Sequence, residues 1–102
     1  MTSSAVDTRN VTVQSVSTTD DTLTAELSDG RTISVPLAWY PRLHHATARE
    51  RDNWRPIGGG QGMHWPDLDE DISVANLLGG QHSGESRDSL KRWLEQRQNP
   101  SD

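Results

Sequence analysis

Apolar and polar residues alternate through the first third of the chain, and a period of two predicts β-strands. The alternation is cleanest over residues 22–27 and 31–36, and a weaker one begins at Val11. Asp20-Asp21 and Asp29-Gly30 separate these segments. An Asp-Gly pair favours a two-residue hairpin because glycine readily adopts a positive φ. The pattern therefore predicts a three-stranded antiparallel meander with one apolar face.

The apolar face of such a sheet needs a cover, and the next segments carry helix signals. Residues 37–40 predict a single helical turn. Thr47 and Glu50 have the spacing of a capping box, in which each side chain bonds the backbone of the other. This spacing predicts a helix from Thr47 to about Asn53, after which the chain re-enters the sheet at Trp54.

A second amphipathic segment spans residues 86–97. Leu90, Trp93 and Leu94 recur there at the spacing of one helical face. The apolar stripe is too narrow for a helix that is stable alone. We therefore expect this C-terminal helix either to pack on the sheet or to dock on a partner.

The stretch from Ile57 to Gly80 contains most of the glycines of the chain. Its first four glycines predict a tight turn, because glycine reaches backbone angles that other residues avoid. Extended arms at Trp54–Ile57 and Met63–Trp65 complete a Gly-rich hairpin, which Pro66 ends because proline cannot donate to a sheet ladder.

A short helix is predicted after this hairpin. Ser73 suits the N-cap, residues 74–78 are mainly apolar, and Gly79 suits the C′ position. The run from Asp67 to Asp71 contains four carboxylates just before this helix, where the positive end of the helix dipole stabilises negative charge. We interpret the acidic run mainly as the approach to the helix, with a recognition patch as the alternative.

Length and composition indicate a single small α+β domain. The chain has 102 residues and neither cysteine nor phenylalanine. Disulfides and thiolate metal sites are thereby excluded, and tryptophan, tyrosine and the aliphatic residues must form the core. We expect residues 1–9 to be a flexible N-terminus, residues 10–80 to form the α+β domain, and residues 81–102 to form a linker and the C-terminal helix.

Charge and hydropathy bear on partners and localisation. The formal net charge of −5 opposes non-specific binding to nucleic acid, which depends on neutralising phosphates. No apolar run has the length of a membrane span, and the N-terminus lacks the pattern of a signal peptide. We expect a cytoplasmic protein without a membrane association.

Several motifs together resemble a known family. They are D-G-R-T-I-S-V-P-L-A-W-Y-P-R-L from Asp29, A-T-A-R-E-R from Ala46, and G-M-H-W-P-D-L-D-E-D-I-S-V-A-N-L-L-G-G from Gly62. The sequence from about residue 10 to residue 80 is similar to the bacterial domain of unknown function 2442. Its most specific part is His64-Trp65-Pro66 with the acidic run that follows.

This resemblance implies a curved antiparallel sheet, a meander with helices against it, and no assigned activity. Some relatives are joined to a helix-turn-helix module or encoded beside small toxin-like partners, which implies a regulatory or antitoxin-like role. After Gly80 only 22 residues remain, with one predicted helix and no pair of DNA-recognition helices. We therefore do not expect this protein to bind nucleic acid on its own.

Two ligand-binding motifs are incomplete. Asp67, Asp69 and Asp71 match the start of a calcium loop, but Ile72 and Leu78 occupy the places that require glycine and glutamate. The glycine-rich turn is not followed by the helix and the Lys-Ser/Thr pair that P-loops require. We expect neither a bound metal nor a cofactor.

Three of the four histidines and one glutamate are the only set that could mimic a metal or acid–base site: His44, His45, Glu50 and His64. Adjacent histidines point to different faces of a strand or helix, so His44 and His45 would hardly share one ion. Neither a zinc-protease motif nor a hydrolase nucleophile elbow occurs. We expect no catalytic residue and a protein that is not an enzyme.

Aromatic residues are the leading candidates for an interaction surface. In a chain without phenylalanine we expect most of them in the core. One or two should lie partly exposed beside the Gly-rich turn and form a groove, since indoles and phenols also anchor interfaces. With two residues of the acidic run, the interaction candidates are Trp39, Tyr40, Trp54, Trp65, Asp69, Asp71 and Trp93.

These features favour a non-enzymatic protein-interaction or regulatory module, such as an antitoxin-like subunit. Its expected partner is another protein, and a homodimer is a further arrangement to test. One alternative is a nucleic-acid regulator that uses a local basic face of Arg42, Arg49, Arg51 and Arg55. A second alternative is a small enzyme centred on His64 and the acidic run.

Overall fold

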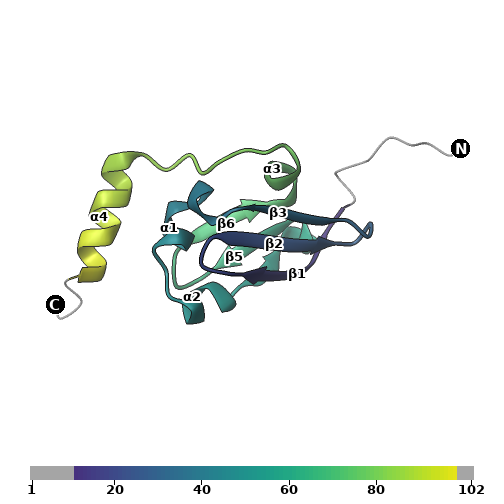
Figure 1. The fold of residues 1–102 in the computed structure, drawn as a ribbon, viewed down its shortest axis with the longest axis horizontal. Coiled ribbons are helices and arrows are strands. Elements are labelled where there is room, and N and C mark those ends of the chain that lie inside the picture. The colour runs from purple at the N-terminus through teal and green to yellow at the C-terminus, as the bar shows by residue number, and fades with distance from the viewer. Residues whose placement is uncertain (1–10, 99–102) are drawn as a thin grey trace, which may run out of the picture.

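The computed structural model describes residues 11–98 and has an α+β fold (Figure 1). The predicted flexible N-terminus, residues 1–9, lies outside the described residues. Two three-stranded antiparallel sheets form the domain. The first sheet confirms the predicted meander and contains, in spatial order, β1 (Val13–Thr18), β2 (Thr22–Leu27) and β3 (Thr32–Pro36).

A β-bulge in β1 explains its weak alternation. Val13 pairs with Leu27, but Ser15 pairs with Glu26, so β1 contains one residue more than β2 over this interval. An extra residue reverses the face that the following side chains occupy. Val13 is therefore buried and Val16 is half-buried, although their positions differ by three, an odd number that would otherwise place them on opposite faces.

The second sheet contains the predicted Gly-rich hairpin. Strand β4 (Arg55–Ile57) pairs with β5 (Gly62–Trp65), and a 3₁₀ turn, η3 (Gly58–Gly60), connects them. The expectation that the chain re-enters the first sheet at Trp54 is wrong. Within residues 11–98, these strands belong to a separate sheet, in which β5 also pairs with a third strand, β6 (Glu70–Ser73).

The interpretation of the acidic run as the approach to a helix is also wrong in its second half. Glu70 and Asp71 belong to β6, where they pair with Trp65 and His64 of β5. The chain reverses between the strands, and Asp69 adopts a φ of 50° there, a conformation that aspartate tolerates better than most residues. The negative charges alone favoured a position just before a helix. Pairing with β5 instead places Glu70 and Asp71 in a strand.

Five short helices complete the described chain: η2 (Leu37–Trp39), α1 (Pro41–His44), α2 (Ala48–Asp52), α3 (Val74–Leu78) and α4 (Arg87–Gln98). The predicted capping box at α2 is confirmed: Glu50 N donates to Thr47 Oγ1 at 3.1 Å, and Thr47 N donates to Glu50 Oε1 at 2.9 Å. Ser73 caps α3 as predicted, accepting from Asn76 N at 3.0 Å.

The C′ residue of α3 is Gly80 rather than the predicted Gly79. Gly80 has a φ of 71°, and its N–H donates to Leu77 O, while Gln81 N donates to Asn76 O. This pair of bonds is the Schellman motif, which satisfies the last carbonyls of a helix. Gly79 keeps helical angles, so α3 ends one residue later than the sequence suggested.

One apolar cluster joins both sheets and the short helices. Leu23 and Leu27 of the first sheet and Met63, Trp65 and Ile72 of the second are at most 2 % exposed. In Figure 1 the first sheet lies in front of β5 and β6, so the core is the layer between two sheets. Among the helices of the described residues, none combines the length and the hydropathy that a membrane span requires.

Helix α4 lies at one end of the domain, beyond α1 and α2 (Figure 1). An irregular segment, residues 81–86, connects it to α3. The helix is therefore attached to the end of the domain and does not cover the apolar face of the first sheet.

We expect Gly60→Ala to destabilise the protein more than Gly59→Ala. Both residues have positive φ, 94° and 69°, which costs an alanine about 1 kcal/mol. Only at Gly60 would the new Cβ collide, at 2.9 Å from Thr12 Cβ, whereas at Gly59 nothing lies within 4 Å. Gly60→Ala should therefore lower the free energy of unfolding by about 2 kcal/mol. Urea denaturation of both variants measures this difference, and equal losses would contradict it.

Candidate interaction site at the C-terminal helix

The segment that leads to α4 is fixed to the domain near η2. Tyr40 Oη donates to Gln81 O at 2.7 Å, and Ser83 N donates to Trp39 O at 2.9 Å. The indole of Trp39 stacks on the His82 ring at 4.1 Å between centroids. These contacts set the position from which α4 begins.

Arg42 of α1 joins this segment to the turn between β5 and β6. Its Nε and Nη2 donate to both carboxylate oxygens of Glu85 at 2.7–3.0 Å, and its Nη1 donates to Leu68 O at 2.9 Å. The Glu85 side chain is only 8 % exposed. The bonds from Arg42 lower the pKa of Glu85 and raise the pKa of Arg42, so the pair is fully charged at neutral pH.

The indole of Trp93 on α4 contacts two guanidinium groups. The Cζ atoms of Arg42 and Arg97 lie 5.2 Å and 4.6 Å from the ring centroid, within the range of cation–π attraction. Trp93 is half-buried and packs against the edge of the core. It is thus the main apolar contact of α4 with the domain.

An ion pair between Arg97 and Glu50 holds the far end of α4. Both guanidinium Nη atoms of Arg97 donate to the Glu50 carboxylate, at 2.8 and 3.0 Å. The hydrogen bonds from Arg97, and then the bond from the Thr47 N–H, lower the pKa of Glu50 to about 2, although burial acts in the opposite direction. The pair therefore stabilises the folded state at pH values above the ordinary pKa of 4.5, and this contribution is lost as the pH falls from there toward 2.

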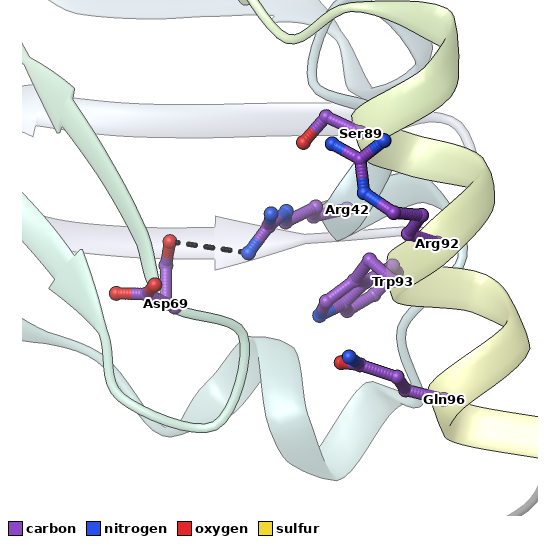
Figure 2. Close-up of a pocket in the computed structure, with 6 residues that line it drawn as sticks. All are labelled: Arg42, Asp69, Ser89, Arg92, Trp93 and Gln96. Carbon is purple, nitrogen blue, oxygen red and sulfur yellow. Dashed lines mark hydrogen bonds between the residues drawn. The ribbon is translucent and has the colours of Figure 1, made fainter.

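A cavity of about 330 Å³ opens between α4 and the β5–β6 turn. Figure 2 shows Trp93 and Gln96 pointing from α4 toward the turn that carries Asp69. The Arg42 guanidinium lies between this turn and α4. The Asp69 carboxylate points away from the helix, while its backbone oxygen faces Arg42. The six lining residues are Arg42, Asp69, Ser89, Arg92, Trp93 and Gln96.

Behind this turn lies Glu70, whose pKa is strongly raised. Burial, and then the charge of Glu85, raise its pKa to about 7; Asp71 and Asp69 act in the same direction, and Arg42 opposes them. Burial and the Glu70 charge also raise the pKa of the Tyr40 phenol. Glu70 therefore changes its charge close to neutral pH, next to the contacts that hold α4.

The predicted interaction residues lie in different environments: some are buried, some are half-buried and some are exposed. Trp65 and Tyr40 are buried in the core, and Trp39, Trp54 and Trp93 are half-buried. Asp69 and Asp71 are exposed. Only Asp69 and Trp93 line the cavity together, and this cavity borders α4 rather than the Gly-rich turn, where the groove was expected.

The sequence interpretation missed the pairing of Arg42 with Glu85 and of Glu50 with Arg97, which are 43 and 47 residues apart. The sequence contains no periodic signal for such pairs. Ser89 Oγ donates to Glu85 at 2.8 Å, and this contact between residues four apart is the local part of the arrangement around Glu85.

The predicted basic face for nucleic acid does not form as a unit. Arg51 is buried, 7 % exposed, and donates to Ala46 O at 2.7 Å and to Thr18 Oγ1 at 3.1 Å. Arg42 is occupied by Glu85, so only Arg49 and Arg55 of the four arginines are exposed. Arg51 can be buried because its guanidinium donates hydrogen bonds to carbonyls at the end of α1.

The alternative of an enzyme centred on His64 corresponds in the structure to one close pair. His64 Nδ1 lies 2.5 Å from Asp71 Oδ1 across the β5–β6 ladder. A carboxylate can orient an imidazole in this way, but acid–base catalysis also requires a bound substrate within reach. Among residues 11–98, no group of three histidine or acidic side chains could hold a metal ion.

Comparison with known proteins identifies a family and a fold. Residues 13–83 match the model of a family described as protein of unknown function (DUF2442). None of the curated proteins matches the chain.

Two solved structures have a similar fold. A protein of unknown function from Rhodospirillum rubrum is 20 % identical, with a TM-score of 0.64, and the alignment covers 79 % of this chain and 98 % of that protein. An uncharacterized protein from Chromobacterium violaceum is also 20 % identical, with a TM-score of 0.62 and coverage of 79 % and 74 %.

Proposed function

The chain belongs to the DUF2442 family, whose function is unknown, and we propose that it is a non-enzymatic module that binds another protein, as a regulatory or antitoxin-like subunit. The observation that carries this proposal is the half-buried Trp93 between two arginines at the edge of the domain. Tryptophan and arginine are the residue types most enriched at binding hot spots.

The environment of Trp93 supports the same proposal. Leu90 and Leu94 of α4 are also only half-buried, and the cavity beside Trp93 remains open. A partner that packs against α4 would bury these apolar groups at about 25 cal/mol per Å² of apolar surface. Exposed polar residues surround them, as in the rim of an interface.

Co-purification from the host tests this proposal. The tagged full-length protein should recover one partner in stoichiometric amount, and Trp93→Ala should reduce its recovery, because an interface tryptophan typically contributes about 2 kcal/mol or more. Trp54→Ala is the matched control, since Trp54 is also half-buried but does not line the cavity. Recovery of no stoichiometric partner, or equal losses in both variants, would contradict the proposal.

Two further measurements separate the alternatives. A nucleic-acid regulator should shift DNA or RNA mobility at low salt and lose the shift steeply as salt rises; we expect no such shift. The mass of the purified protein in solution distinguishes a homodimer from a monomer whose partner is a different protein. A dimer broken by Trp93→Ala would make a second copy of this chain the partner.

A further inference from the structure

The carboxyl group of Glu70 lies at the edge of the core and makes no hydrogen bond within residues 11–98. Glu70 is opposite Trp65 in the β5–β6 ladder, and residues paired across antiparallel strands project from the same face of a sheet. Because Trp65 is fully buried, Glu70 projects to the core side of the sheet, where it is half-buried. Asp71 projects from the opposite face, where it contacts His64. Glu70 is therefore a partly desolvated acidic group that belongs to none of the ion pairs described above.

The groups that hold the start of α4 surround this carboxyl group. Arg42 of α1 attracts a charge on Glu70, whereas Glu85, in the segment before α4, repels it. The Tyr40 phenol, which donates to Gln81 O, lies near enough for the charge of Glu70 to affect it. The other charges that act on Glu70 are those of Asp69 and Asp71 in its own turn and strand. One guanidinium thus lies near two acidic side chains, and in this structure it is bonded to Glu85.

Helix α4 contacts the domain mainly through charged groups and one indole. Its start is fixed by Glu85, its far end by the Arg97–Glu50 ion pair, and Trp93 packs between them. A helix of twelve residues is marginal in water when it is isolated. Release of α4 from the domain would therefore also unwind it, and such local opening requires less free energy than unfolding of the whole domain.

From this arrangement, we infer that Glu70 controls the docking of α4: a negative charge on Glu70 weakens the bond between Arg42 and Glu85, and the helix leaves the domain more often. The charge attracts Arg42 and repels Glu85, so both effects act against the docked position. The inference concerns this chain alone and goes beyond the proposed function.

The direction of the pH dependence follows from linkage. The charge of Glu85 is, after burial, the largest cause that raises the pKa of Glu70 to about 7. Coupling between two groups is reciprocal, so ionisation of Glu70 in turn disfavours Glu85 at this position. The helix is therefore held most firmly below about pH 7, where Glu70 is protonated, and is released more often above it.

Hydrogen exchange of the full-length protein between about pH 6 and pH 8, measured by NMR, tests this inference. The exchange rates of the amides of residues 90–96, divided by their intrinsic rates at each pH, give the opening constant of α4. We expect this constant to rise about fivefold over the range, the change for a carboxyl group whose proton affinity falls about tenfold on opening. The amides of β2 report unfolding of the domain and should exchange more slowly than those of α4.

Three variants identify the titrating group. Glu70→Gln should remove the rise and keep the opening constant close to its wild-type value near pH 6. Glu26→Gln, on an exposed residue of β2, should retain the rise. His82→Gln should also retain it. His82 lies in the segment before α4, and histidine is the residue type that ordinarily titrates in this range.

Several results would overturn the inference: an opening constant of α4 that does not change with pH, a rise that persists in Glu70→Gln, or loss of the rise in either control variant. Equal opening constants for α4 and β2 at every pH would also overturn it, because the helix would then open only when the domain unfolds. Since no partner is present in this experiment, its result does not depend on the proposed interaction function.

Discussion

Trp65→Ala should lower the free energy of unfolding by about 3–5 kcal/mol, the typical cost of truncating a buried tryptophan. The Trp65 side chain is fully buried and belongs to the cluster between the sheets. Its Nε1 also donates to Arg51 O at 3.0 Å and thereby satisfies a carbonyl in the last turn of α2. The loss is a large share of the roughly 5–15 kcal/mol that stabilises a typical domain.

A comparison of three variants separates the contributions at this position. Trp65→Phe retains most of the apolar volume but leaves Arg51 O without its donor, so we expect a loss of about 1–3 kcal/mol. Trp54→Ala removes a half-buried indole and should cost less than Trp65→Ala. Urea unfolding followed by circular dichroism measures all three. If Trp54→Ala were as costly as Trp65→Ala, Trp65 would not be the centre of the core.

The stability of the protein should fall as the pH rises from about 4.5 to about 7, because of Glu70. The pKa of Glu70 is about 7 in the folded state, against 4.5 for a free glutamate. Between these values the folded protein keeps a proton that the unfolded chain releases, so rising pH favours unfolding. The expected loss is about 2–3 kcal/mol, because each pKa unit corresponds to about 1.4 kcal/mol and partial exposure reduces the total.

Glu70→Gln removes this titration. The variant should be more stable than the wild-type protein by about 2–3 kcal/mol at pH 8 and nearly equal to it at pH 4.5. The groups that act on Glu70 are Glu85, Asp71 and Asp69, with Arg42 opposing them, and all of these remain in the variant. Urea unfolding at a series of pH values measures the difference, and a gain that is independent of pH would contradict the assigned pKa.

The elements that local patterns specify were predictable from the sequence. The alternation of β2 and β3, the capping box at Thr47 and the Gly-rich hairpin each depend on residues close together in the chain, and the structure contains all three. The capped helix α3 was also predicted, with its end displaced by one residue. Local signals succeed here because they agree with the tertiary packing.

The elements that depend on distant partners were not predictable in the same way. Strand β6 contains Glu70 and Asp71, residues of low strand propensity, and exists because β5 supplies a ladder for it. The same holds for the candidate site. Arg42 was grouped with other arginines by sequence proximity, but its partners Glu85 and Trp93 come from the C-terminal segment.

The anchoring of residues 81–83 limits how far α4 can move. Ser83 is bonded to Trp39 O, Glu85 is bonded to Arg42, and α4 begins at Arg87. The segment between Ser83 and Arg87 would reach at most about 14 Å even if it were fully extended. Because this connecting segment is short, α4 stays near Glu50 and Arg42 at an effective concentration on the order of millimolar. A partner that binds Trp93 must therefore displace an intramolecular contact of α4. A change in the length of residues 84–86, which would also disturb the Arg42–Glu85 pair, should change the apparent affinity for that partner.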